Sequence, residues 1–185
     1  RERLPQKRVA IVGYTNAGKS TLLNAPSKSD AHVEDRLFAT LAPTTRKLYI
    51  GEDANYKPRV ILCSDTVGFV RNLPHQLVEA FRSTLEEAAG AHLLVHVVDA
   101  SSDDVKGNIE AVNLVLAEID AGEIEQIIVW NKIDNLSEDQ LSELNEFDFD
   151  YKHENKKVKS SFFLSAKTGQ GIETLREFFF NHPNL

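Results

Sequence analysis

A single short stretch limits the folds open to this chain more than any other feature. Residues 13–20 read Gly-Tyr-Thr-Asn-Ala-Gly-Lys-Ser, after an apolar run at 9–12 and before Thr21-Leu22-Leu23. The pattern G-x-x-x-x-G-K-S between a strand and a helix is typical of a phosphate-binding loop, because the glycines let successive backbone N–H groups point at phosphate oxygens. A glycine-rich turn that ends in Lys-Ser by chance would not need this context. The chain is therefore expected to be a P-loop protein.

The residues of this loop have different expected roles. Lys19 supplies a positive charge for the β- and γ-phosphates, and the Ser20 hydroxyl is placed to ligate Mg²⁺. The N-terminus of the following helix adds partial positive charge at the same point. We expect nucleotide contacts from the whole run: Gly13, Tyr14, Thr15, Asn16, Ala17, Gly18, Lys19, Ser20 and Thr21.

The bulk composition agrees with one globular domain. The 185 residues, 42% hydrophobic and 26% charged, suffice for a single core of ordinary size. The formal net charge of −7 excludes a surface that is cationic throughout. Any RNA contact therefore has to use a local patch. The candidate is a basic run that otherwise reads as a solvated loop: Lys152, Lys156, Lys157 and Lys159.

The cysteine content and the charged N-terminus favour a cytoplasmic protein. Cys63 is the only cysteine, which excludes a disulfide framework and a cysteine metal cluster, and we expect it in the core. No apolar run approaches the roughly 18 residues of a membrane span, and the charged N-terminus is unlike a signal peptide. We expect a cytoplasmic monomer. Because the chain begins at Arg1 and has no methionine, we expect residues 1–185 to be one domain of a longer protein.

Short apolar runs alternate with amphipathic segments along the chain. Strands are expected at 7–12, 46–50, 59–64, 92–98, 127–130 and 161–164. Helices are expected from Gly18 to near Asn24, from Pro74 to Gly90, from a cap at Ser102 or Asp103 to Gly122, over 137–146 and over 172–180. Segments 26–45 and 147–159 are expected to be loops. The alternation predicts an α/β fold, with a six-stranded, mainly parallel sheet and helices on both faces.

A first motif follows the strand expected at 59–64. It reads Asp65-Thr66-Val67-Gly68. A carboxylate at this point can hold Mg²⁺ through water, and the glycine N–H can meet the γ-phosphate. The pattern D-x-x-G is weak by itself, because Asp and Gly are common after strands. Its place after a phosphate loop is what favours the functional interpretation.

A second motif, Asn131-Lys132-Ile133-Asp134, follows the strand at 127–130 and indicates the base. Guanine presents two adjacent N–H donors that suit the Asp134 carboxylate, whereas adenine would leave it unpaired. A buried polar group left unpaired is worth discrimination on the order of 10⁴. Asn131 is expected to bond back to the loop, and the Lys132 stem to lie along the purine. Ser165-Ala166-Lys167 is expected to offer backbone N–H groups to the guanine O6.

Together these residues resemble P-loop GTPases of the Ras type, and more closely the GTPase domain of the HflX family. The resemblance covers nearly the whole chain and is carried by residues 13–20, 36–41, 65–69, 72–75, 80–87 and 108–112. It implies a domain that binds GTP or GDP with Mg²⁺ and hydrolyses GTP. It also implies a preceding N-terminal domain and binding to the large ribosomal subunit. Some family members separate stalled ribosomes into subunits.

The resemblance further implies two switch segments, roughly 30–45 and 66–75. Thr40 is implied as the switch threonine and as a third Mg²⁺ ligand beside Ser20 and Asp65, with Thr44 or Thr45 as alternatives. Nucleotide contacts are implied for Phe38, Ala39, Thr40, Leu41 and Ala42. Pro26 and Ala42 depart from the family pattern, so the local path of the first switch stays open.

Hydrolysis is the least determined part of the expected function. Many GTPases use a Gln after D-x-x-G to orient the attacking water, and here that position is Phe69. One hypothesis is a bound K⁺ ion with Asn16 as a ligand, and the alternative is that the ribosome completes the site. The expected catalytic residues are Lys19, Asn16, Thr40 and Gly68.

Two other functional classes compete with a GTPase. One is a guanine-nucleotide-binding module with negligible hydrolysis, for which Phe69 is the supporting feature. The other is an ATP-dependent kinase or ATPase, in which Asn131 and Asp134 would be accidental.

Overall fold

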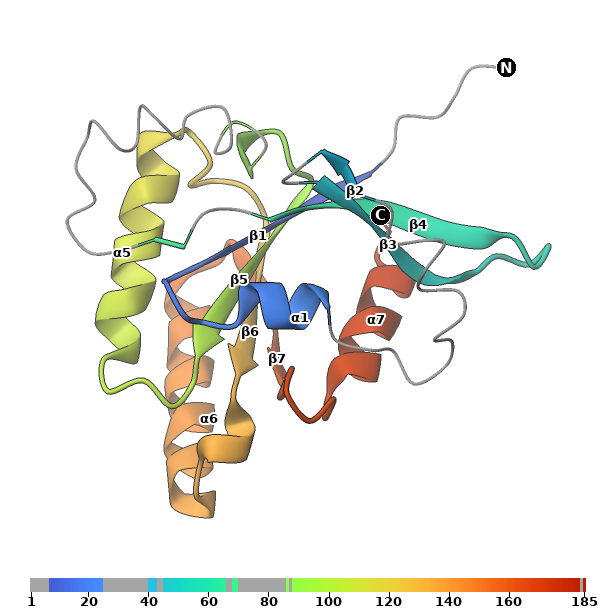
Figure 1. Cartoon of the computed structure of the whole chain (residues 1–185). Helices are drawn as coiled ribbons and strands as arrows, with labels where there is room; N and C mark the ends of the chain where they lie inside the picture. Colours follow the sequence, from blue (N-terminus) through green and yellow to red (C-terminus); the bar gives the residue numbers. More distant parts are fainter. Residues whose placement is uncertain are drawn as a thin grey trace.

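The computed structural model describes residues 7–24, 40–42, 45–65, 68, 69, 86, 88–183 and 185. For residues 40–42, 45, 46 and 65 it describes the backbone alone. These parts form one twisted sheet with helices on both faces (Figure 1). The α/β class predicted from the alternation is confirmed.

The sheet is mainly parallel, with β1 near its middle. Its strands are β1 (Arg8–Gly13), β2 (Thr40–Ala42), β3 (Thr45–Glu52), β4 (Pro58–Asp65), β5 (Leu93–Asp99), β6 (Gln126–Asn131) and β7 (Val158–Phe163), in the order β2-β3-β4-β1-β5-β6-β7. β1 pairs in parallel with both β4 and β5, whereas β2 and β3 are antiparallel. Ligands bind at the carboxyl ends of strands where the chain changes sides of such a sheet, and here that point is the end of β1.

The expected six strands are all present, and the described residues add a seventh. This strand is β2, whose three residues pair with β3 at the edge of the sheet. It falls at the end of the segment predicted as a loop. The rest of that segment, residues 26–39, lies outside the described residues.

Helices cover both faces of the sheet (Figure 1). Those in the described residues are α1 (Lys19–Leu23), α5 (Val105–Glu118), α6 (Glu138–Glu154) and α7 (Ile172–Asn181), with the 3-10 turn η1 at Ile133–Asn135. α1 ends at Leu23 with Asn24 as its C-cap, close to the end predicted from Pro26. The helix predicted from Pro74 to Gly90 lies mostly outside the described residues. None of the described helices is long and apolar enough to cross a bilayer.

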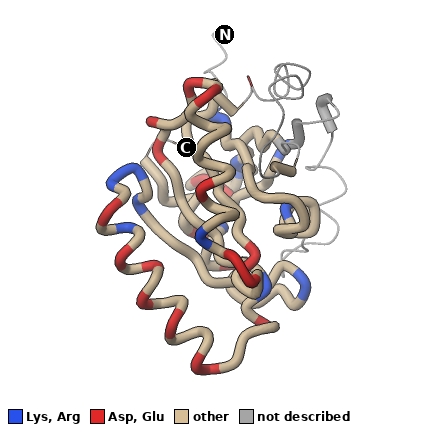
Figure 2. Tube along the Cα trace, turned by 90° about the vertical axis from the view of Figure 1, so that its left-hand side faces the viewer, with Lys and Arg blue, Asp and Glu red and all other residues tan. Residues whose placement is uncertain are grey.

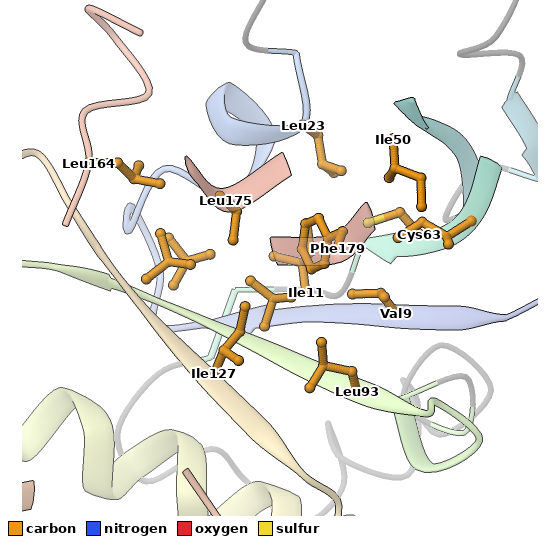
Figure 3. Packing of buried hydrophobic residues seen from close by; sticks show 14 of the residues in the cluster. Val9, Ile11, Leu23, Ile50, Cys63, Leu93, Ile127, Leu164, Leu175 and Phe179 are labelled. Carbon is orange, nitrogen blue, oxygen red and sulfur yellow. The ribbon is translucent and has the colours of Figure 1, made fainter. Parts of the chain in front are cut away.

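The central strands are buried on both sides. Ile11 of β1 packs in a cluster with Leu175 and Phe179 of α7 (Figure 3), whereas the next residue, Val12, belongs to the cluster under α5. Such strands need apolar residues on both faces, which explains their continuous hydrophobic runs. Cys63 is buried in the first cluster, so its prediction as a core residue is confirmed.

The prediction of a loop over 147–159 is wrong. α6 continues to Glu154, and β7 begins at Val158. The residues that bind α6 to the sheet recur at helical spacing, but acidic residues surround them and obscure the stripe: Leu144, Phe147, Asp148 and Tyr151.

Asp148 attaches this charged segment to the sheet. Its carboxylate is buried and accepts hydrogen bonds from the Trp130 indole N–H at 2.9 Å and the Ser161 hydroxyl at 2.7 Å, with Lys152 Nζ 3.0 Å away. A buried carboxylate with these partners avoids the desolvation cost of an unpaired one. Because Trp130 directly precedes Asn131, the contact also steadies the strand end that carries the base motif.

The start of α5 differs slightly from the prediction. Asp104 is the N-cap and accepts a hydrogen bond from the Gly107 N–H at 3.0 Å. Neither predicted cap, Ser102 or Asp103, is the N-cap, and the Ser102 hydroxyl instead accepts a hydrogen bond from Asn108 Nδ2 at 2.9 Å. Side chains on both sides of the turn therefore hold the end of β5 close to the beginning of α5.

Candidate functional site

The loop between β1 and α1 is packed so closely that its two glycines have no substitute. A Cβ atom on Gly13 would lie 2.5 Å from the Val97 carbonyl oxygen. One on Gly18 would lie 2.3 Å from Asn131 Nδ2, and Gly18 also has a left-handed φ of 94°. Only glycine has room at these two positions, and only glycine adopts the φ of Gly18 without strain. The predicted spacing of the loop therefore follows from its contacts with β5 and β6.

Lys19 lies across the mouth of this loop. Its side chain is 8% exposed, and its ammonium donates hydrogen bonds to the carbonyl oxygens of Gly13 and Tyr14 at 3.3 and 3.4 Å. The following residues of α1, Ser20 and Thr21, are exposed. A cation and an exposed hydroxyl thus stand side by side at the start of α1, as a phosphate with its metal ion requires.

Gly68 reaches the same loop from the end of β4. A Cβ atom on Gly68 would lie 3.0 Å from Thr15 Cα and 3.4 Å from Lys19 Nζ. The predicted partner of the γ-phosphate is thus close to the cation predicted to bind it. The backbone of Asp65 ends β4 in register with Ile11, whereas Thr66 and Val67 lie outside the described residues.

Phe69 points away from the loop. Its side chain is 1% exposed and packs in the apolar cluster of Val12, Leu94 and Val112. Its backbone is joined to the loop, because Phe69 N–H donates to Gly13 O at 3.0 Å and Thr15 N–H donates to Phe69 O at 2.8 Å. The sequence shows that residue 69 lacks a hydrogen-bonding side chain. The structure adds that this side chain is part of the core.

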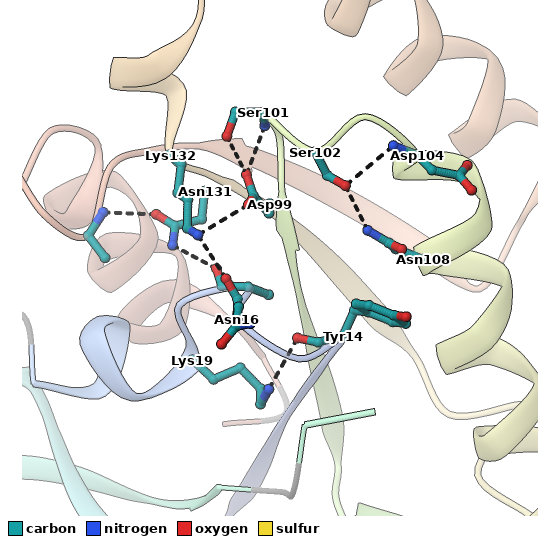
Figure 4. A network of polar contacts seen from close by, with 12 residues as sticks. Tyr14, Asn16, Lys19, Asp99, Ser101, Ser102, Asp104, Asn108, Asn131 and Lys132 are labelled. Carbon is teal, nitrogen blue, oxygen red and sulfur yellow. Dashed lines mark hydrogen bonds and ion pairs between the residues drawn. The ribbon is translucent and has the colours of Figure 1, made fainter. Parts of the chain in front are cut away.

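Asn131 joins three of the predicted motifs. It is 2% exposed at the end of β6, where its Nδ2 donates to the Ala17 carbonyl at 2.9 Å and its Oδ1 accepts from the Ala166 N–H at 2.9 Å (Figure 4). The predicted bond back to the loop is therefore confirmed. Both polar ends of one amide are used, so its orientation is fixed by its partners.

Lys132 crosses from the base motif to the loop. Its left-handed φ of 65° turns the side chain back, so that Nζ donates to the Asn16 carbonyl at 2.8 Å and to Asp99 Oδ2 at 3.1 Å (Figure 4). The other oxygen of Asp99 accepts from the Ser101 N–H at 2.9 Å and the Ser101 hydroxyl at 2.6 Å. Burial raises the pKa of Asp99, but the hydrogen bonds from Ser101 and Lys132 outweigh burial and leave this pKa below its ordinary value.

Asp99 is the residue of this network that the sequence analysis missed. Its signal is its position, because it is the last residue of a buried parallel strand beside the strand that carries Asn131. Carboxyl ends of neighbouring parallel strands meet at one edge, so a charged residue there is a candidate partner for the base motif.

The other residues predicted to contact the base are Asp134 and the segment Ser165-Ala166-Lys167. Asp134 is exposed in η1. The Ser165 N–H donates to the Gln170 carbonyl at 2.9 Å, and the Ala166 N–H is taken by Asn131. Of the three amides predicted to face the guanine O6, that of the exposed Lys167 has no hydrogen bond among the described residues.

The first switch is described only in part. Thr40, Leu41 and Ala42 form β2, for which the backbone alone is described, and Thr45 begins β3. Phe38, Ala39 and Thr44 lie outside the described residues. Among the residues that are described, no three His, Cys, Asp or Glu side chains gather as a metal site. The choice between Thr40 and its alternatives stays a prediction.

The sequence of this chain is similar to that of known GTPases. Residues 8–132 match the family described as "50S ribosome-binding GTPase". The chain is 47% identical to the GTPase HflX of Escherichia coli over 167 residues, which is 90% of this chain and 36% of that protein. It is 57% identical to the GTPase HflX of Caldanaerobacter subterraneus over 128 residues, which is 69% of this chain and 29% of that protein. The chain thus spans about a third of the length of these relatives.

Solved structures of similar fold include one crystallised with guanine nucleotide. A GTP-binding protein of the archaeon Sulfolobus solfataricus, crystallised with GDP, superposes with a TM-score of 0.73 at 27% identity. The match covers 94% of this chain and 51% of that one. The G-domain of FeoB from Methanococcus jannaschii shares the fold at 20% identity, with a TM-score of 0.57 over 96% of this chain and 97% of that chain.

Proposed function

Because the chain belongs to the family of 50S ribosome-binding GTPases, we propose that it is the GTPase domain of a ribosome-associated HflX-like protein. In this role it binds GTP, hydrolyses it to GDP and phosphate, and acts as a nucleotide switch. The observation that carries the proposal is the double hydrogen bond of Asn131 to Ala17 and Ala166. It brings the phosphate loop, the base motif and the Ser165–Lys167 turn into one site.

Guanine is the proposed base. Asp134 is exposed beside this site, where its carboxylate can accept from N1–H and the exocyclic amine, and the Lys167 N–H supplies a donor for O6. The direct experiment is competition of GTP, GDP and ATP against a fluorescent GDP analogue. GTP and GDP are expected to displace the analogue, and ATP is not. Equal displacement by ATP would restore the kinase or ATPase alternative.

Mg²⁺ is the proposed metal. Ser20 fits this role, because its hydroxyl is exposed beside the buried Lys19 in α1. Asp65 and Thr40 are proposed as the further ligands. The metal would neutralise charge on the phosphates that Lys19 also binds. A nucleotide affinity that EDTA leaves unchanged would count against it.

Hydrolysis is proposed to depend on K⁺, because the buried Phe69 side chain cannot orient water. Asn16 is the proposed ligand. It lies exposed in the loop with a left-handed φ of 62°, while its backbone carbonyl is held by Lys132. Single-turnover hydrolysis should be faster in K⁺ than in Na⁺, and Asn16→Ala should remove the difference while nucleotide still binds. Equal rates in the two salts would leave completion of the site to the ribosome.

The large ribosomal subunit is the proposed partner, in the cytoplasm, with the domain acting as a monomer. Figure 2 shows acidic residues following one another along α6, with basic residues near one of its ends. Two lysines of the basic run form hydrogen bonds within the chain. Lys152 Nζ donates to the Ser161 hydroxyl at 2.8 Å, and Lys157 Nζ donates to the Gly122 carbonyl at 3.0 Å. RNA phosphates are therefore expected to meet faces other than the acidic side of α6.

Ribosomal subunits provide the test of this partner. Cosedimentation should be stronger with large than with small subunits, should depend on GTP, and should weaken as salt rises. A guanine-nucleotide-binding module with negligible hydrolysis is the second candidate, and the burial of Phe69 favours it. Single-turnover rates that stay negligible in K⁺ and with large subunits would select that candidate.

A further inference from the structure

Asp99 and Lys132 are brought together by the sheet itself. β5 and β6 pair in parallel, with Asp99 opposite Asn131, and the Ala100 N–H donates to the Asn131 carbonyl at 2.9 Å. The residue after Asn131 therefore starts beside Asp99. The ion pair of Lys132 with Asp99 follows from this register, because a shift of the strands would separate the two side chains.

The Asp99 carboxylate is also fixed in orientation. Both the backbone N–H and the hydroxyl of Ser101 donate to its Oδ1, which directs Oδ2 toward Lys132 Nζ. The Asp99 and Lys132 side chains are only 24% and 33% exposed. A pair of this kind, partly buried and with one partner locked, is less screened than an ion pair on the open surface.

Lys132 has two acceptors, and they differ in kind. The Asn16 carbonyl at 2.8 Å belongs to the phosphate loop and is neutral, whereas Asp99 at 3.1 Å is charged. With both acceptors in place, the stem of the side chain is stretched between β6 and the loop. With the carbonyl alone, the lysine would regain much of the rotamer freedom that long side chains have in solution.

We propose that Asp99 is a positioning residue for guanine, acting through Lys132 by holding its ammonium so that the lysine stem forms one wall of the base site. The inference rests on the proposed function, because it concerns how the same site retains its nucleotide. Asp99 touches neither the phosphates nor the reacting atoms in this scheme. It should therefore affect the release of GTP and GDP alike and leave hydrolysis at saturating GTP unchanged.

The test is a double-mutant cycle on the rate of nucleotide release. Asp99→Ala should speed release of a fluorescent GDP analogue about tenfold, the scale of one lost hydrogen bond to a charged group. Lys132→Met keeps an apolar stem but has no ammonium. In that background the same Asp99→Ala change should alter release by less than about twofold, because contacting residues are not additive.

Three further variants separate positioning from a general structural effect. Asp103→Ala removes an exposed carboxylate from the same turn and should leave release unchanged. Asp99→Asn keeps one oxygen for Ser101, so it is the variant to use if Asp99→Ala does not fold. It should still speed release, because the charge facing Lys132 is gone. Asp99→Glu keeps the charge and should recover most of the slow release.

The outcomes distinguish this inference from the function on which it rests. Unchanged release in Asp99→Ala, or an equal acceleration with and without the Lys132 ammonium, would overturn the inference alone. A lower hydrolysis rate at saturating GTP would also overturn it, because a positioning residue of the base site changes KM and leaves kcat in place. Failure of the unaltered protein to bind guanine nucleotide would overturn the proposed function together with the inference.

Discussion

The two sides of the phosphate loop are held by different kinds of contact. On the base side, side chains make the connections, through Asn131 to Ala17 and through Lys132 to Asn16. On the side of Gly68 the connections among the described residues are backbone hydrogen bonds between Phe69 and the loop, and the Phe69 side chain packs into the core. Base recognition is therefore open to change one side chain at a time. Among the described residues on the other side, the buried Phe69 side chain fixes the path of the backbone and offers no polar group to the loop.

The largest expected effect is on the base side. Asp134→Asn should shift the preference from GTP toward xanthosine triphosphate, because an amide can donate to the carbonyl at position 2 of xanthine where the carboxylate could only accept. Loss of preference for GTP is expected on the order of 10⁴-fold. Competition of the two nucleotides against a fluorescent analogue measures it, with Asp139→Asn, exposed at the start of α6, as the matched control. An unchanged preference would mean that Asp134 does not read the base.

An intermediate effect is expected at Phe69, and it concerns stability. Phe69→Gln places an amide in an apolar cluster and should lower the free energy of unfolding by about 3 kcal/mol. Denaturation with guanidinium chloride measures the loss, and Phe69→Leu, which stays apolar, should cost about half as much. Single-turnover hydrolysis should not increase in either variant. A Gln variant that is as stable as the original and hydrolyses GTP faster would show that residue 69 can turn toward the nucleotide.

Per pH unit, the smallest expected effect is a difference in the response to acid, and this difference accumulates over several pH units. His96 of β5 is buried, and its Nδ1 has no hydrogen-bond partner in the described part of the chain. Burial lowers the pKa of His96 from 6.5 to about 3, and the charges of Lys157 and Lys19 act in the same direction. The unfolded chain binds this proton below pH 6.5 while the folded one does not. Stability is therefore full above pH 6.5 and falls toward pH 3 by up to about 1.4 kcal/mol per pH unit.

His96→Leu should flatten this dependence between pH 6.5 and pH 4, measured by denaturant unfolding at each pH. Asp99 acts in the same sense, because its pKa is also lowered, from 3.8, but its contribution is lost only in more acidic solution. His92→Leu, at an exposed histidine of the segment before β5, is the control. An equal slope in the His96 variant and the original would assign the acid response to other groups.

Several features were predictable because they require particular residue types at particular spacings. Gly13 and Gly18 are needed by close contacts, and Asn131 by two partners that only an amide satisfies. These constraints are local, so they leave a pattern in the sequence. The alternation of strands and helices is likewise local, and it predicted the α/β class.

Other features depend on partners that the sequence does not place together. Asp99 contacts Lys132 because of the register of β5 beside β6, and no residue near Asp99 in the sequence predicts this contact. The buried stripe of α6 includes Asp148, whose place in it follows from its contact with Trp130, a residue separated from it by η1 and most of a helix. The direction of the Phe69 side chain depends on its backbone pairing with the loop. Each was invisible to local reasoning for the same physical reason.

The pairing of Tyr14 with Phe69 has a consequence for the order in which the molecule opens. The amide protons of Thr15 and Phe69 are held in hydrogen bonds that resemble one more rung of the parallel sheet. Their exchange with solvent therefore requires β1 and the residues after β4 to separate, an opening that also exposes the apolar cluster around Phe69. These two amides should exchange with the slow protons of the core strands, as members of one cooperative unit that includes part of the phosphate loop.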